Sequence, residues 1–179
     1  PIYKQMDYDP SSLTLEPVSD MKYALPLEAD WDWHLGNKPT LAGYLHSKLS
    51  KPDNYYFWIL YNAHPVGIVG LNIHPDHKQW QTIIYLNKTS RGKGVNTFIH
   101  KTLSEAFTHT GVTLIASIDV KNTASINSFS KMLNSQGSIV LEQTLKREAC
   151  IYILTEETFT TNANTNQDII EIIVELGLK

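Results

Sequence analysis

The apolar positions of the chain follow two periods, which divide most of it into short strands and amphipathic helices. Runs of apolar, aromatic and β-branched residues bounded by turn sequences predict the strands. The first is marked by Leu13, Leu15 and Val18, and the others span 55–60, 66–73, 80–87, 112–120, 138–143 and 150–154. The sequence Asn62-Ala63-His64-Pro65 predicts a reverse turn, so the second and third strands should form a hairpin. The last two strands are expected to form another.

Apolar residues three and four positions apart predict helices between these strands. The pattern is helical from Ser19 to about Leu49, where we expect breaks at Pro26 and at the turn 36–39. A longer helix should run through Thr108, and a further one should begin at Asn122. This order of elements predicts an α/β (α+β) domain with a mixed sheet.

The C-terminal part has a different composition. Residues 158–167 are polar and of low complexity, which predicts a linker between a domain over 1–157 and a helix over 168–179. That helix is apolar nearly all round, so it must be covered. It could dock on its own domain, contact a partner or a second copy of the chain, or begin a further domain. It also faintly resembles the opening helix of an acyl carrier domain.

Charge and cysteine content exclude several classes of protein. The 179 residues carry 15 Lys+Arg and 18 Asp+Glu, without a basic block, so no nucleic-acid partner is expected. There is no run of about 18 apolar residues, and the N-terminal residues lack the pattern of a signal peptide, so we expect no membrane contact. The single cysteine, Cys150, excludes an internal disulfide and a cysteine-based metal site, and fits a cytoplasmic protein.

The main chemical signal is the segment Arg91-Gly92-Lys93-Gly94-Val95-Asn96, between a predicted strand and a predicted helix. Glycines allow a sharp turn and a close approach of a ligand to main-chain N–H groups, and the helix directs its unpaired N–H groups to the same place. Arg91 is one of only two arginines, and its guanidinium suits phosphate oxygens. The turn therefore predicts a phosphate or pyrophosphate site, or else a turn that needs glycine only for geometry. Its spacing fits neither a P-loop nor a dinucleotide fingerprint.

The next strand is followed directly by Asn122-x-x-Ser125. Together with the glycine turn, this segment resembles the GNAT acyltransferase superfamily, and more closely its Rim-type N-acetyltransferase branch, over roughly residues 12–155. The family signature R-x-x-G-x-G/A corresponds to Arg91, Gly94 and Asn96, and the branch's N-x-x-S-x-x-x-x-x-K element to Asn122, Ser125 and Lys131. The two motifs in the right order are more specific than either alone.

The resemblance implies a mostly antiparallel sheet that is splayed between its fourth and fifth strands, with acetyl-CoA in the splay. It implies that pantetheine pairs with the backbone of Tyr85, Leu86 and Asn87, and that pyrophosphate binds the N–H groups of Arg91, Gly92, Lys93, Gly94, Val95 and Asn96. Asn122 and Ser125 would hold the pantetheine and thioester end of coenzyme A. The implied activity is transfer of an acetyl group to a primary amine, such as a peptide N-terminus, an amino sugar or another small amine. The amine attacks the thioester directly, so neither a metal nor an enzyme nucleophile is needed.

Three residues depart from the family pattern. Asn96 replaces a small Gly or Ala, so its side chain must either turn aside or itself bond a phosphate. Gln81 stands where many relatives have a Glu that accepts the proton through water. Phe129 stands where many have a tyrosine that acts as general acid, although the Rim-type branch often has an aliphatic residue there.

A different proton acceptor is therefore expected, in the loop after the third strand. His74, Asp76 and His77 lie there, and histidine titrates near neutral pH. The alternative is that all three are solvated loop residues, and that the chain is a non-catalytic acyl-CoA-binding or interaction module. Asp119 either faces the splay or bonds loop amides. Trp31, Trp33 and His34 are candidates for the wall of an acceptor pocket.

Overall fold

Seven strands form one mixed sheet in a computed structural model of the chain, in the order β1-β2-β3-β4-β5-β7-β6. The structure describes residues 8–31, 38, 40–73, 79–108, 110–133, 135–142, 146–159 and 165–176. The strands are β1 (Leu13–Pro17), β2 (Asn54–Tyr61), β3 (His64–Ile73), β4 (Gln79–Leu86), β5 (Thr113–Asp119), β6 (Ser138–Glu142) and β7 (Arg147–Leu154). The α-helices of the described ranges are α1 (Ala24–Glu28), α2 (Leu41–Leu49), α3 (Val95–Phe107), α4 (Thr123–Leu133) and α5 (Gln167–Val174).

The predicted mixed α/β fold is confirmed, with small differences in the elements. Pro26 lies inside α1 instead of breaking the helix, because it is in the first turn, where a missing N–H costs no intrahelical bond. Thr40 begins α2 as its cap and accepts a hydrogen bond from the Gly43 N–H at 3.0 Å. Strand β7 begins at Arg147, three residues before the predicted start at Cys150.

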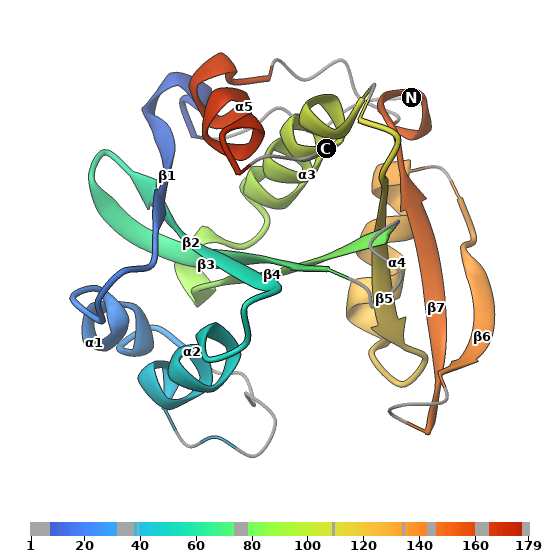
Figure 1. The fold of residues 1–179 in the computed structure, drawn as a ribbon, viewed down its shortest axis with the longest axis horizontal. Helices are drawn as coiled ribbons and strands as arrows, with labels where there is room; N and C mark the ends of the chain where they lie inside the picture. The colour runs from blue at the N-terminus through green and yellow to red at the C-terminus, as the bar shows by residue number, and fades with distance from the viewer. Residues whose placement is uncertain are drawn as a thin grey trace.

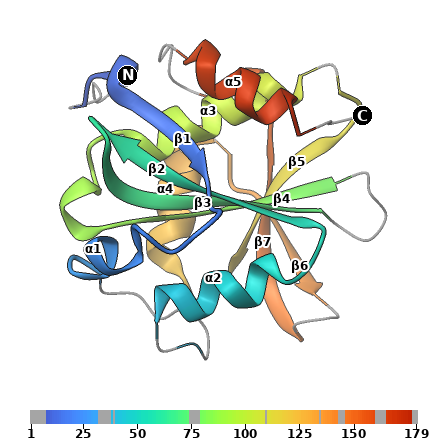
Figure 2. The same ribbon diagram turned by 60° about the vertical axis from the view of Figure 1, so that its left-hand side comes forward.

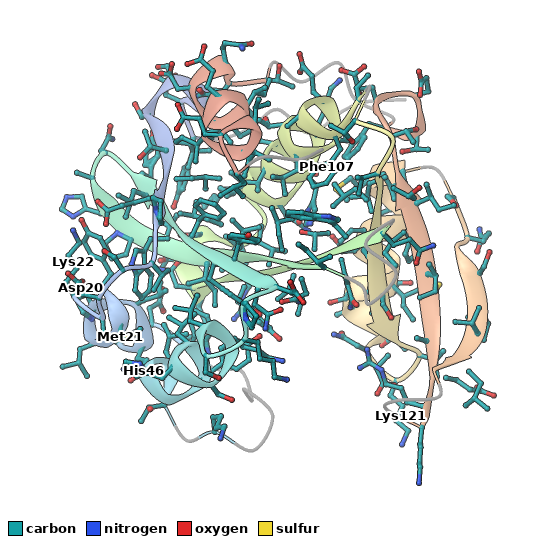
Figure 3. All side chains as sticks on the ribbon, viewed as in Figure 1. Asp20, Met21, Lys22, His46, Phe107 and Lys121 are labelled. Atoms are coloured by element: carbon teal, nitrogen blue, oxygen red, sulfur yellow. The ribbon has the colours of Figure 1, made fainter. Side chains whose placement is uncertain are left out.

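Helices cover both faces of the part of the sheet formed by β1 to β4 (Figures 1 and 2). Strand β2 is apolar along most of its length because its alternating side chains enter two different cores. Phe57 and Ile59 belong to the core that includes α3 and α5, whereas Trp58 belongs to the core formed with α1 and α2. On the α3 side, the ring of Phe107, labelled in Figure 3, lies 5.5 Å from that of Trp80.

The sheet divides between its fourth and fifth strands, as expected. Strands β4 and β5 are parallel and pair only at Gln79↔Thr113, Trp80↔Leu114 and Gln81↔Ile115. Beyond these pairs β4 stays on β3 as far as Leu86, while β5 stays on β7 as far as Asp119. The two strands therefore diverge, and Figure 1 shows β4 and β5 running in clearly different directions.

The C-terminal helix α5 packs on α3 and β1 of the same chain (Figure 1). Its residues Ile169 and Ile173 are completely buried, while Val174 is 53% exposed. Asn166 caps the helix, and its Nδ2 donates to the main-chain O of Leu13 at 3.2 Å. The structure shows that α5 is covered by its own domain, which is one of the three expected arrangements. A partner that bound through 168–179 would therefore have to contact the outer face of this helix. The division into a domain over 1–157, a linker over 158–167 and a tail helix over 168–179 stays a prediction.

Within the described ranges, no helix combines the length and the apolar composition needed to cross a lipid bilayer.

Candidate active site in the splay of the sheet

A cavity of about 610 Å³ lies between the diverging strands. Its wall is built from five parts of the fold. They are β4 (81–86), the turn and start of α3 (Arg91, Gly92, Asn96 and His100), β5 (116–119), the start of α4 (Asn122, Ala124, Ser125, Ser128 and Phe129) and Arg147 of β7. The splay, which the family resemblance implied, and the glycine turn therefore border the same space.

The glycine turn has a backbone that other residues adopt with strain. Gly92 and Gly94 have φ of 69° and 89°, in the left-handed region that favours glycine. Gly94 is the N-cap of α3, and its carbonyl accepts from the Phe98 N–H at 3.0 Å. The N–H groups of the first turn of α3 have no partner further back in the helix, so the helix presents donors and its positive dipole end beside the cavity wall.

Arg91 is held across the end of β4. Its Nε donates to the main-chain O of Leu86 at 3.2 Å, and both residues lie on the cavity wall. This bond uses one donor of the guanidinium and sets the direction of the group. The arginine thus places a positive charge where the donors of α3 also converge.

Asn96 turns its side chain toward His100, one helical turn later. The Nδ1 atom of His100 lies 2.5 Å from Oδ1 of Asn96 and 3.1 Å from the main-chain O of the same residue. On the other side of the ring, Nε2 lies 3.1 Å from Oγ1 of Thr82 in β4. The ring of Phe129 packs against the histidine at 5.1 Å between centroids. These contacts connect the glycine turn, β4 and α4 through one side chain.

His100 is completely buried, and burial lowers its pKa to about 4. A histidine with this pKa is neutral at physiological pH and is a weak base. Its Nε2 is in addition occupied by the Thr82 hydroxyl. His100 therefore lines the cavity without being suited to accept a proton from a substrate.

Tyr85 lines the cavity and packs against other aromatic rings of the core that includes α1 and α2. The ring of Tyr85 lies 6.0 Å from that of Tyr44 and 5.9 Å from that of Trp31. The hydroxyls of Tyr44 and Tyr56 lie 3.1 Å apart, and burial raises the pKa of Tyr56 to about 12 and the pKa of Tyr85 above its usual range. These phenols are neutral at physiological pH. Trp31 contacts Tyr85 but does not itself line the cavity, so its place in an acceptor pocket wall stays a prediction, while Trp33 and His34 lie outside the described residues.

The opposite wall carries polar groups of β5 and α4. Asn122 caps α4 by accepting from the Ser125 N–H at 3.2 Å, and both side chains lie on the wall. Oγ of Ser117 is buried on the same wall and has no hydrogen-bond partner among the described residues. A buried hydroxyl without a partner is costly in a protein, which favours a polar ligand group at this point.

Two charged residues of the cavity wall, Asp119 and Arg147, form an ion pair. Asp119 lies 3.9 Å from Nη1 of Arg147 and accepts from the Lys121 N–H at 2.9 Å. Asp119 therefore both faces the splay and bonds a loop amide, the two alternatives expected for it. Figure 3 shows Lys121 at the foot of β5, with its side chain directed away from the body of the molecule.

Most of the predicted cofactor-binding residues lie on the cavity wall. These are Tyr85, Leu86, Arg91, Gly92, Asn96, Asn122 and Ser125. Lys93, Gly94 and Val95 belong to the turn but do not line the cavity, and the Val95 side chain is part of the core. Asn87 donates its N–H to Val66 and its Oδ1 accepts from Ser90, so its main chain and side chain are engaged elsewhere. The candidate proton acceptors His74, Asp76 and His77 lie outside the described residues.

Sequence reasoning missed five polar residues of the wall: Thr82, His100, Ser117, Ser128 and Arg147. A partial signal existed for His100, since it follows Asn96 by four residues and thus shares its helix face. Thr82 and Ser117 are single small polar residues in apolar strands, a pattern that does not reveal which face they occupy. Among the described residues, no group of three or more His, Cys, Asp or Glu is placed to hold a metal ion.

Comparisons with known proteins agree with this geometry. The model of the Acetyltransferase (GNAT) family matches residues 18–134. A search of curated protein sequences gave no significant match.

Solved structures share the fold at low sequence identity. AAC(6')-Ib in complex with ribostamycin and coenzyme A is 20% identical, with a TM-score of 0.63, 86% of this chain covered and 99% of that chain. A putative acetyltransferase is 18% identical, with a TM-score of 0.63 and coverage of 88% and 90%. A chimera of the spermidine N-acetyltransferase from Vibrio cholerae and hSSAT is 15% identical, with a TM-score of 0.59 and coverage of 82% and 96%.

Proposed function

Since the chain belongs to the GNAT acetyltransferase family, we propose that it moves an acetyl group from acetyl-CoA to a small primary amine in one ternary complex. Enzymes of this family use acetyl-CoA, and acyl-CoA-dependent N-acyl transfer is the activity of the chain. The observation that carries the detailed proposal is the divergence of β4 and β5 after three residue pairs, with the glycine turn at the edge of the resulting cavity. What we propose is the class of the amine acceptor, the residues that bind acetyl-CoA and the residue that accepts the proton.

The residues of the cavity fit acetyl-CoA. Pantetheine would lie along Tyr85 and Leu86, which line the cavity beyond the last residue pair between β4 and β5. Asn87 would not contact pantetheine, because its N–H donates to the Val66 carbonyl at 2.9 Å. The turn of Arg91, Gly92, Lys93, Gly94, Val95 and Asn96 would hold the pyrophosphate. Asn122 and Ser125 would hold the pantetheine and thioester end, where the Ser117 hydroxyl still lacks a described partner.

Bound acetyl-CoA would supply an activated acyl group, whose transfer forms an amide N–C bond, breaks the thioester C–S bond and leaves the thiol of coenzyme A. The residues of the chain bring the reactants together and exclude water. Ile83, Ile84, Ile118 and Phe129 give the cavity its apolar lining. In such a lining, a hydrogen bond from Ser125 to an acyl or pantetheine oxygen is stronger than in water.

The amine must lose a proton during transfer. His100 is excluded as its acceptor by its burial and its occupied Nε2, and the Asp119 carboxylate is paired with Arg147. We propose that His74, Asp76 or His77 accepts the proton, since their loop directly follows β3 and leads into β4, which lines the cavity. The affinity of histidine for protons near neutral pH suits this role.

The acceptor is proposed to be an amine of the kind that the named neighbours suggest, or a peptide N-terminus or amino sugar. The names of those neighbours mention spermidine and ribostamycin, both amines. The Asn122-x-x-Ser125 element supports a place in the Rim-type branch, because Asn122 caps α4 and thereby fixes Ser125 on the wall. A cytoplasmic location is proposed from the single cysteine, Cys150, which is buried as a free thiol.

Calorimetric titration with acetyl-CoA, followed by a thiol-release assay against a panel of amines, tests this proposal. We expect saturable binding and release of coenzyme A that depends on at least one amine class. Absence of acetyl-CoA binding would overturn the proposal. Tight binding without turnover on any amine would favour the alternative of a non-catalytic acyl-CoA-binding module.

Replacing His74, Asp76 and His77 by alanine together tests the proton acceptor. Acetyl-CoA affinity should stay unchanged, while kcat should fall by a factor of about 10² or more, as for the loss of a general base. Single variants then identify the residue, and the pH profile of kcat/KM should lose its acidic limb in that variant. Unchanged turnover in the triple variant would refute this assignment and leave the acyltransferase activity standing.

A further inference from the structure

We infer that the Asn96 side-chain amide is an additional phosphate-binding donor of the glycine turn, and that His100 is the positioning residue that fixes this amide. The inference rests on the proposed function, in which the turn holds the pyrophosphate of acetyl-CoA. In that function, the binding groups of the turn are main-chain N–H groups and Arg91. Asn96, which departs from the family's small residue, adds a group from its side chain.

The hydrogen bonds of His100 determine the orientation of the Asn96 amide. The main-chain O of Asn96 can only accept, so the ring nitrogen 3.1 Å away, Nδ1, must carry the hydrogen. The same Nδ1–H faces the Asn96 side chain at 2.5 Å, so the atom placed there must be the acceptor Oδ1. Nε2 is then unprotonated and accepts from the hydroxyl of Thr82. Only this orientation of the Asn96 amide pairs a donor with an acceptor at each of these contacts.

With Oδ1 turned to His100, the Nδ2 group forms the other end of the amide. No described residue accepts a hydrogen bond from Nδ2. Asn96 is half-buried at the second position of α3, and it lines the cavity together with Arg91 and Gly92. An amide NH₂ supplies two N–H donors, and phosphate oxygens are strong acceptors of such bonds. The Asn96 amide therefore presents donors to the same place as the main-chain groups of the turn.

His100 is built to hold this orientation and not to react. Its side chain is completely buried, with Thr82 on one edge and the ring of Phe129 on one face. It cannot change rotamer without leaving a buried polar group of Thr82 or Asn96 unpaired. As a neutral group, it also adds no charge beside the phosphates.

Two acyl donors distinguish this role from a structural one. S-acetylpantetheine carries the thioester and the pantetheine of acetyl-CoA but no pyrophosphate. Asn96→Ala should raise the Kd of acetyl-CoA about tenfold, the effect of one hydrogen bond to a charged group, and leave the Kd of S-acetylpantetheine unchanged. Asn96→Asp keeps the shape of the side chain but replaces the donor by a negative oxygen, so it should weaken acetyl-CoA binding more than alanine does.

Two substitutions of His100 test the positioning role. Asn places an N–H near the position of Nδ1, whereas Gln reaches the position of Nε2. His100→Asn should therefore retain most of the acetyl-CoA affinity, while His100→Gln should lose as much as Asn96→Ala. The double variant Asn96→Ala/His100→Gln should bind no more weakly than either single variant, because both remove the same contact.

The control is Thr102→Val, a buried position on the same helix that does not line the cavity. It should leave the affinity for both acyl donors unchanged, and each variant is used only where its far-ultraviolet circular dichroism matches that of the parent. The inference is overturned if Asn96→Ala binds acetyl-CoA as the parent does, or loses the same factor for both acyl donors. If the parent itself fails to bind acetyl-CoA, the proposed function fails as well, and this outcome is distinguishable from the first two.

Discussion

Single residues carry the chemistry of this site, and Arg91 shows how a local contact prepares a side chain for its ligand. Replacing Arg91 by alanine should weaken acetyl-CoA binding roughly tenfold or more, because a charge-assisted bond to phosphate is lost. The free energy of unfolding should change by no more than about 0.5 kcal/mol, as for most half-buried surface positions. Calorimetric titration and urea unfolding of the same variant measure the two quantities.

Two comparisons complete the Arg91 experiment. Arg91→Lys keeps the charge but loses the bond from Nε to the Leu86 carbonyl, so its affinity should lie between those of the parent and the alanine variant. Lys88→Ala removes an exposed positive charge close to the turn but not on the cavity wall, and its effect should be small. Parent-like affinity in Arg91→Lys, together with equal losses in Arg91→Ala and Lys88→Ala, would show that Arg91 acts only through the overall charge.

The buried neutral His100 makes stability depend on pH. The pKa of His100 is about 4 in the folded protein, against an unfolded value near 6.5. Between these values the unfolded chain binds a proton that the folded chain does not, so stability falls as the pH is lowered from about 6.5 toward 4. The contribution is about 1.4 kcal/mol per pH unit. Urea unfolding from pH 7 to pH 4.5 should show that this part of the slope is missing in His100→Asn; parallel curves would contradict it.

At the scale of single residues, the sequence predicts the features that depend only on neighbouring residues in the chain. The glycine turn with Gly92 and Gly94 and the start of a helix at Asn122 follow from local sequence, and the structure contains both. The contact between Thr82 and His100 joins residues that are 18 positions apart on two different elements. Such a contact depends on how α3 lies on β4, which no local pattern encodes.

The secondary-structure elements themselves were largely predictable, because the alternation of strands and the period of helices are local properties. The start of β7 at Arg147 was missed, since its first residues are polar or small and pair with the edge strand β6. The place of α5 was not predictable either. An apolar helix must be covered, but only the tertiary structure shows that α3 and β1 cover it.

Helix α5 provides a matched pair of substitutions on neighbouring residues. Ile173 is completely buried, so Ile173→Ala should lower the free energy of unfolding by about 2–4 kcal/mol through lost burial and a cavity. Val174 is 53% exposed, and Val174→Ala should change stability by less than about 0.5 kcal/mol. Urea unfolding of both variants measures the difference. Equal, small effects would show that α5 does not pack on the domain in solution.

At the scale of the whole molecule, the splay divides the sheet into two parts that share only three residue pairs. The family resemblance predicted this division, because it is a property of a fold and not of any segment. The resemblance did not predict the width of the cavity or the ion pair of Asp119 with Arg147. Both depend on how far β5 and β7 turn away from β4. A ligand bound between the two parts should therefore act on the stability of the complete sheet.

Hydrogen exchange tests this expectation. In the splay, β4 from Ile83 to Leu86 and β5 from Ser117 to Asp119 lie beyond the last residue pair that joins the two strands, Gln81↔Ile115. Acetyl-CoA binds only the folded state and would bridge these edges, so it should raise the melting temperature and slow amide exchange in both strands as well as in the turn 91–96. S-acetylpantetheine at an equally saturating concentration should protect the strands and leave the turn unchanged. Protection confined to the turn with acetyl-CoA would show that pantetheine does not lie between β4 and β5, and would remove the splay from the proposed binding site.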